Sequence, residues 1–208
     1  MFRLSAIWNH LKQMRGYIGF SFVLFFAGIV IGGTNPAFRS FLDGQLAGLQ
    51  QMVAIVDQAE NKTLAMIVVI FLNNAIKSIF IMYLGAFFGF VPLFFLVVNG
   101  MVIGYLLQLT AAKPEAMPVY ELVFKGLLPH GIIEIPAIIV ACAYGLKFGS
   151  LVLRSTGSLL FSRGKLRGIG SEMSEFVIRT VPMIVILTVA LLVASIIEST
   201  FTGWLLSL

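Results

Sequence analysis

Five apolar runs, each about 20 residues long, constrain this chain more than any other feature. Lipid offers the backbone no hydrogen-bond partner, so segments that cross a bilayer are helices or strands of a closed barrel. The runs lack the alternation of barrel strands, which favours helices. Composition agrees, because only 11% of the residues are charged, against about 25% in soluble domains. We therefore predict an all-α integral membrane protein with five transmembrane helices, at residues 17–33, 63–88, 91–111, 119–153 and 177–197.

Two further segments have the pattern of amphipathic helices at a membrane interface. In residues 1–16 the apolar side chains share one helical face, with Trp8 as an interfacial anchor and His10 on the solvated polar face. The segment 36–61 follows Asn35, a good N-cap residue, and starts with a proline at the first helical position. Its apolar residues recur at helical spacing, so we expect an external helix packed over the bundle.

The fourth run, 119–153, contains residues that disfavour a continuous helix. Proline lacks the backbone N–H and clashes with the preceding turn, and glycine lowers helix stability. Pro129 and Gly131 therefore predict an interruption within residues 128–132, and Pro136 follows in the second half. The first half is expected to be a separate, re-entrant piece, because irregular backbone at this depth needs a lining of protein or water.

Basic residues are concentrated on one side of the predicted membrane. Nine lysines and arginines flank spans on the side of the N-terminus, and the other side carries three, offset by acidic residues. This bias predicts a multi-pass protein of the cell membrane with a cytoplasmic N-terminus. The segment 154–175 is the most basic, and its charges either contact anionic headgroups or form an ordinary positive loop. The residues expected to contact headgroups are Arg154, Arg163, Lys165 and Arg167.

Amide and ionisable side chains interrupt the apolar runs. A charged side chain at the bilayer centre costs about 2.5–3.5 kcal/mol on insertion scales, so these groups are expected to face the bundle interior and to pair. Residues three or four positions apart share a helical face, which allows pairing within each run. The predicted intramembrane polar cluster consists of Asn73, Asn74, Lys77, Asn99, His130 and Glu134.

The cluster has two interpretations. In the structural one, His130 and Glu134 satisfy backbone groups freed at the helix break and tie to the segment 73–77 across the bundle. In the functional one, the cluster binds or moves a proton, an ion or a polar group of a substrate. Both require Glu134 to be buried and in contact with His130 or with the segment 73–77, because an unpaired buried carboxylate is too costly.

Other kinds of site are not indicated. One histidine and one glutamate at H-x-x-x-E spacing fall short of a metal ligand set, and neither H-E-x-x-H nor a phosphate-binding loop motif occurs. No serine or cysteine lies beside a base and an orienting group, and Cys142 in an apolar run fits a buried, inert thiol. We expect no catalytic residue, metal, cofactor or nucleic-acid partner. Glycines at four-residue steps predict close helix packing within one chain; they are Gly28, Gly32, Gly85, Gly89, Gly100 and Gly104.

Three blocks of the sequence resemble the stage II sporulation protein M family of bacteria and archaea. They are FLNNAIKSI, VPLFFLVVNGMVIG and LLPHGIIEIPAIIVACAYGLKFG, and together they cover roughly residues 65–150. The resemblance implies a membrane protein without catalytic activity of its own, which in spore formers acts in engulfment as a partner of cell-wall hydrolases. Many relatives occur in organisms that never sporulate. The recurring residues of the family correspond to Asn73, Asn74, Asn99, Gly100, His130, Gly131, Glu134 and Pro136.

Two main functional hypotheses follow. The first is a non-enzymatic membrane scaffold or assembly factor that lies in the lipid bilayer and partners other membrane or cell-envelope proteins. The second is a small transporter or channel-like protein, which a short chain would form as a homodimer. An intramembrane enzyme is a third hypothesis. A dry, paired cluster would favour the scaffold, and a cavity that reaches His130 and Glu134 would favour the transporter.

Overall fold

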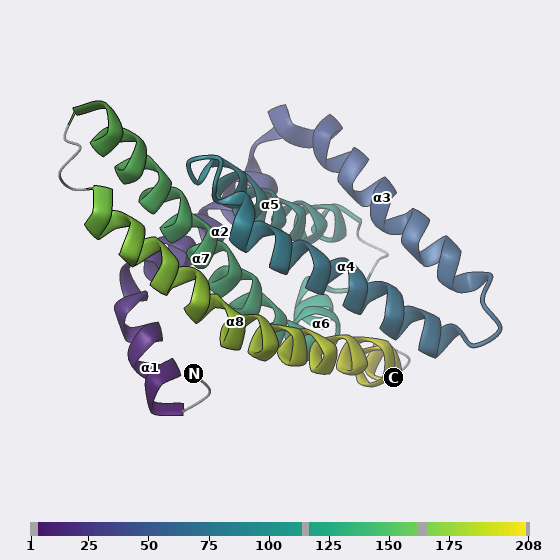
Figure 1. Cartoon of the computed structure of the whole chain (residues 1–208). Helices are drawn as coiled ribbons and strands as arrows, with labels where there is room; N and C mark the ends of the chain where they lie inside the picture. The colour runs from purple at the N-terminus through teal and green to yellow at the C-terminus, as the bar shows by residue number, and fades with distance from the viewer. Residues whose placement is uncertain (1–3, 114–116, 162–165, 207–208) are drawn as a thin grey trace.

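The computed structural model describes residues 4–113, 117–161 and 166–206, which form a bundle of tilted helices without strands (Figure 1). Five helical stretches in these ranges are long and apolar enough to cross a membrane, so the predicted all-α membrane fold is confirmed. They are α2 (Arg15–Thr34), α4 (Lys62–Leu84), α5 (Phe90–Ala111), the stretch Val119–Phe161, and α8 (Leu166–Ile197) with its C-terminal extension.

Glycines bring α2 and α5 into backbone contact. Gly28 and Gly32 of α2 face Gly100 and Gly104 of α5, and a Cβ added at Gly28 would lie 2.5 Å from the carbonyl oxygen of Val97. Only a residue without a side chain permits this approach, which maximises van der Waals contact where no hydrophobic driving force joins the helices. The predicted role of these glycines in packing within one chain is confirmed.

A second glycine contact joins the turn after α4 to the fourth span. Gly89 ends this turn with a φ of +80°, in the left-handed region that side chains disfavour. Gly85 lies against the carbonyl group of Gly145, and Gly149 lies against the backbone of Gly89. The fourth span is thereby held at the centre of the bundle, where Tyr144 is fully buried.

The fourth span is helical throughout its length, so the predicted interruption at residues 128–132 is wrong. The helix continues through Pro129, Gly131 and Pro136, and the irregularity lies earlier, as a π-helical segment. A π turn already departs from the i→i−4 hydrogen-bond pattern, so the missing N–H of Pro129 is accommodated just after it. A continuous helix therefore replaces the two expected halves. Its parts are α6 (Val119–Glu121), the π-helical η2 (Leu122–Leu127) and α7 (Leu128–Phe161).

The N-terminal helix α1 (Leu4–Gln13) packs on the bundle with its histidine turned inward. His10 is 8% exposed, and its ring centroid lies 5.5 Å from that of Tyr144 and 6.5 Å from that of Phe176. The expectation of a solvated His10 is therefore wrong, because aromatic rings of α7 and α8 cover it. Trp8 is exposed, as an interfacial anchor requires.

The amphipathic helix α3 (Arg39–Asp57) lies at the periphery of the bundle (Figure 1). It follows a short 3-10 turn, η1 (Pro36–Phe38), whose start is capped by Asn35, as predicted. Buried Leu42 attaches α3 to α5, and the Tyr105 hydroxyl of α5 donates a hydrogen bond to Asp43 at 2.6 Å. The amphipathic pattern thus produces a helix that packs over the bundle, as expected.

The basic segment 154–175 forms the ends of α7 and α8 wherever the structure describes it. Glu172 of α8 binds Lys147 at 2.8 Å and Arg154 at 3.0 Å, so Arg154 has a protein partner. The predicted headgroup residues Arg163 and Lys165, and the side chain of Arg167, lie outside the described residues. Contact of any of these residues with lipid stays a prediction.

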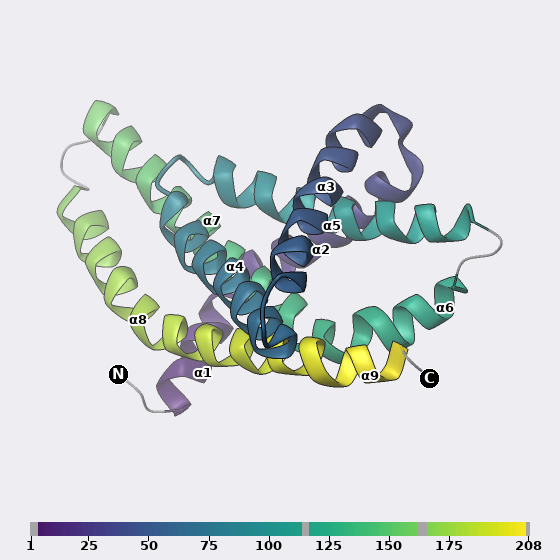
Figure 2. The same cartoon turned by 90° about the vertical axis from the view of Figure 1, so that its right-hand side faces the viewer.

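The last span continues beyond α8 as a second π-helical segment, η4 (Glu198–Thr202), and a short helix, α9 (Gly203–Leu206). Figures 1 and 2 show α8 and its extension as one long helix along one side of the molecule. Its end contacts η2, so the C-terminal segment and the beginning of the fourth span meet. This meeting positions the polar site.

Candidate intramembrane polar site

A chain of hydrogen bonds links α4 to α7. The side-chain amide of Asn73 donates to Oδ1 of Asn74 at 3.2 Å, and Nδ2 of Asn74 donates to Oε1 of Glu134 at 2.9 Å. Glu134 is partly buried. The predicted contact between Glu134 and the segment 73–77 is therefore present, with Asn74 as the partner.

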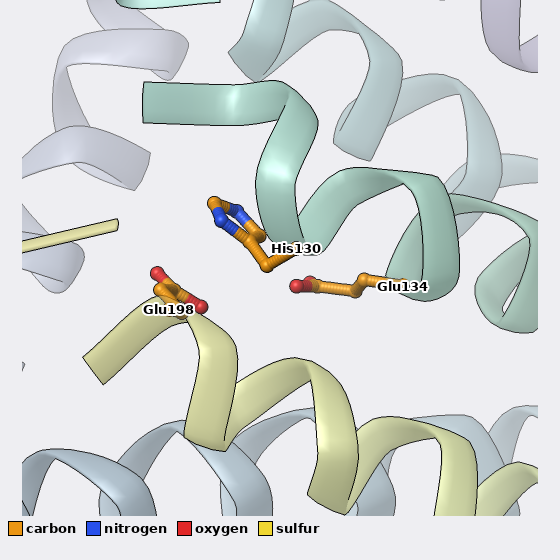
Figure 3. A group of neighbouring side chains, drawn as sticks. All are labelled: His130, Glu134 and Glu198. Carbon is orange, nitrogen blue, oxygen red and sulfur yellow. The ribbon is translucent and has the colours of Figure 1, made fainter. Parts of the chain in front are cut away.

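His130 and Glu134 also meet an acid from the other end of the chain. One ligand atom from each of His130, Glu134 and Glu198 lies within 4.8 Å of the other two, and all three residues are partly buried. Figure 3 shows their side chains directed toward a common space between α7 and η4. We call these three residues the His–Glu–Glu cluster. Thr202 lies beside it, with Oγ1 3.5 Å from Nδ1 of His130.

Sequence reasoning missed Glu198. The residue follows the last apolar run and reads as an acid flanking the outer end of a span. There is little indication in the sequence that Glu198 belongs to a site, because a single carboxylate at the edge of an apolar run is common. The last helix could also have ended before this residue. The continuation of the helix through η4 instead carries Glu198 back against α7.

Both π-helical segments of the described chain adjoin the His–Glu–Glu cluster. The segment η2 ends three residues before His130, and η4 begins with Glu198 itself. π-helical turns are rare and occur frequently at functional sites, where they redirect side chains. Their position here indicates that the convergence of these side chains is a property of the local backbone.

A cavity of about 800 Å³ borders the site and lies among α3, α4, α5 and α7. We call it the chamber. Most of its wall is apolar, including Phe41, Phe94 and Ile138. Its polar lining residues are Gln45, Asn73, Asn74, Lys77, Ser78, Asn99, His130 and Glu134. The chamber therefore reaches every residue of the predicted polar cluster.

Two predicted cluster members line the chamber without joining Glu134. The amide of Asn99 donates to the carbonyl oxygen of Phe95 in its own helix at 2.7 Å. Lys77 makes no ion pair among the described residues, although it lines the same cavity. Lys125, in η2, lies 3.7 Å from Glu121. The structure thus leaves the two carboxylates of the cluster without a basic partner in the described chain.

Sequence comparison establishes the family. The model of the family described as stage II sporulation protein M matches residues 20–203. This chain belongs to the stage II sporulation protein M family. A search of curated proteins and a search of solved structures found no match.

The sequence blocks that resemble the stage II sporulation protein M family come together at the chamber. The block FLNNAIKSI and the block LLPHGIIEIPAIIVACAYGLKFG are joined by the hydrogen bond from Asn74 to Glu134. In the block VPLFFLVVNGMVIG, Asn99 lines the chamber while Gly100 packs against α2. Two of the three cluster residues, His130 and Glu134, belong to the block LLPHGIIEIPAIIVACAYGLKFG, and Glu198 lies near the end of the matched region.

A second cavity, of about 710 Å³, lies at the junction of α1, α7 and α8. His10, Gln13 and Arg179 line it, and the side chain of Gln13 interacts with the His10 ring. Burial, followed by the positive charge of Arg179, lowers the pKa of His10 below its usual value. His10 therefore favours the neutral imidazole in the folded protein.

Proposed function

We propose that this member of the stage II sporulation protein M family is a small transporter-like protein that binds a solute in the chamber. The observation that carries the proposal is the extension of the chamber to the polar cluster. A scaffold would be expected to keep such a cluster dry and fully paired. Here the polar groups on α4 and α7 border an open volume instead.

The dimensions and lining suit an amphipathic solute. Small-molecule sites have volumes of about 300–1,000 Å³, mostly apolar walls and a few polar groups that orient the ligand. The chamber has this character, with Asn74 and Glu134 on its polar side and Phe94 on its apolar wall.

We propose a non-enzymatic role and a homodimer. Binding and release of a solute require no covalent step, and amides, a lysine and partly buried carboxylates are suited to holding polar groups. Three aromatic residues that line the chamber, Phe41, Phe80 and Phe94, have exposed side chains, so a second copy that packs against them would complete the wall. We further propose the cell membrane as the location, with the N-terminus in the cytoplasm, on the basis of the basic-residue bias.

Thiol accessibility tests whether the chamber is open to water. In a Cys142→Ala background, which has no other cysteine, single cysteines replace Asn99 in the chamber and, as a control, exposed Val189 on α8. Sealed vesicles of both orientations are treated with a charged, impermeant methanethiosulfonate. The cysteine at position 99 should react from one side, and the cysteine at position 189 should not react, because lipid excludes the reagent.

The proposal fails if the cysteine at position 99 is unreactive from both sides yet reacts after denaturation. If Asn99→Cys does not fold, Asn73→Cys serves instead, because Asn73 lines the chamber from α4 and is partly exposed. Equal reaction at positions 99 and 189 would also overturn the proposal, since the chamber would then offer no special access.

The scaffold or assembly factor is the second candidate, and α3 favours it. This helix is peripheral and presents exposed apolar residues, including Val53 and Ile55, that do not line the chamber. A photo-crosslinking amino acid at Ile55 should form one discrete adduct with a membrane or cell-envelope protein in cells, and the same amino acid at Val189 should not. Absence of a position-specific adduct would remove the support from α3. An adduct between two copies would instead support the homodimer.

A further inference from the structure

We propose that the His–Glu–Glu cluster binds a divalent first-row transition-metal ion, with Zn²⁺ as the best match. This goes beyond the proposed function, because the three groups converge whether or not the chamber admits a solute. Ligand atoms around a tetrahedral Zn²⁺ lie about 2.0–2.2 Å from the ion and hence about 3.4 Å from one another. The atoms offered by His130, Glu134 and Glu198 lie within 4.8 Å of one another, so small side-chain rotations bring all three onto one ion.

The charge balance of the site points to a cation. Two carboxylates lie side by side in the apolar spans, and like charges at this separation repel strongly where the dielectric constant is low. Glu134 receives a neutral amide hydrogen bond from Asn74. Neither carboxylate forms an ion pair with a basic residue in the described chain. A divalent cation between the two would neutralise both at once.

The ligand types select among cations. Ca²⁺ takes six to eight oxygen ligands and Mg²⁺ demands an octahedron of oxygens, whereas imidazole is a ligand for Zn²⁺ and its first-row neighbours. One imidazole and two carboxylates match this last class. Three protein ligands leave a coordination position open. Two of these ligands, His130 and Glu134, also line the chamber.

The surroundings of the ligands support a built site. Asn74 donates a hydrogen bond to Oε1 of Glu134 and so orients the carboxylate. The other carboxylate oxygen of Glu134 remains available to a metal ion. Groups that orient metal ligands in this way contribute substantially to metal affinity. The π-helical segment η2 ends three residues before His130, and the π-helical segment η4 begins with Glu198. A bound ion would join the C-terminal segment to the fourth span.

Zn²⁺ binding to the full-length protein tests the proposal. Protein without a histidine tag is purified in detergent, freed of metal with a chelator and titrated with Zn²⁺ alone. Wild type should bind one ion per chain. His130→Gln, Glu134→Gln and Glu198→Gln should each weaken binding by at least about 10-fold. Equimolar Mg²⁺ or Ca²⁺ should not compete.

Matched controls identify the site. His10→Gln removes the only other histidine, and Glu121→Gln removes a glutamate of the same span outside the cluster; both should bind like wild type. Glu198→His, which substitutes another zinc ligand, should retain binding and alter the visible absorption spectrum of bound Co²⁺. This variant keeps the test valid if Glu198→Gln does not fold.

Zn²⁺ binding to wild type no tighter than to the triple variant His130→Gln, Glu134→Gln, Glu198→Gln would overturn the proposal. An equal loss of binding in His10→Gln would also overturn it. The thiol-accessibility assay uses no metal, so failure of the metal site and failure of the chamber proposal are distinguished.

Discussion

Gly28→Ala should destabilise the protein by separating α2 from α5. The added Cβ would lie 2.5 Å from the carbonyl oxygen of Val97, whereas Cβ contacts shorter than 3.0 Å essentially never occur. The obstacle is backbone, which cannot rotate aside, so α5 must retreat by about 0.5 Å along a close-packed interface. Overpacking of this kind costs about 1–3 kcal/mol. The higher helix propensity of alanine offsets up to about 1 kcal/mol of this loss in stability.

Gly19→Ala is the matched control, because Gly19 lies in the same helix and an added Cβ there meets nothing within 4 Å. It should leave stability unchanged or raise it by up to about 1 kcal/mol through helix propensity. The free energy of unfolding of both variants is measured in the same detergent by reversible denaturation. The difference between them isolates the clash and should be about 1–3 kcal/mol. Equal stability would show that α2 and α5 do not pack through these glycines.

Three further predictions follow from individual side chains. Glu134→Gln retains an acceptor for Asn74 and should keep most of the thermal stability, whereas Glu134→Ala should lose more than about 1 kcal/mol; equal stability of the two variants would contradict a structural role for the hydrogen bond. Burial lowers the pKa of His10 in the folded state below its value in the unfolded state. Below about pH 6.5 the unfolded state therefore binds a proton at His10 more readily than the folded state, so the free energy of unfolding should fall as the pH decreases. His10→Gln should flatten that part of the pH–stability curve, and an unchanged slope would refute the assignment. Cysteines at Phe2 and Lys165 should be labelled by an impermeant reagent only from the cytoplasmic side, and labelling from outside in intact cells would reverse the orientation.

Much of the fold could be predicted because its determinants are local. A run of apolar residues specifies a membrane helix without reference to other segments, since the backbone must satisfy itself in lipid. The same holds for Asn35 and Pro36, whose capping geometry involves only adjacent residues. The contact of Glu134 with the segment 73–77 followed from a cost argument, because a buried carboxylate needs a partner and the chain offers few.

The errors arise where two segments decide an outcome together. Pro129 does not break its helix because the π turn of η2 accommodates the missing N–H. The residue propensities of this segment do not predict a π turn. His10 is buried because Tyr144 and Phe176, distant in sequence, cover it. Its own helix has the pattern of a surface helix in either case.

The sequence by itself determined that the chain is a helical membrane protein, that its polar residues within the spans need partners, and that its glycines permit close packing. Each of these conclusions follows from the transfer of a helix from water into lipid, where backbone and polar groups lose their water partners and helices associate by close packing. This effect applies to each segment separately. Only the tertiary structure decided that Glu198 joins His130 and Glu134, and that the chamber opens beside them. Those outcomes depend on how far the last helix extends and where it crosses α7, and crossing geometry is set by packing between helices, which no single segment encodes.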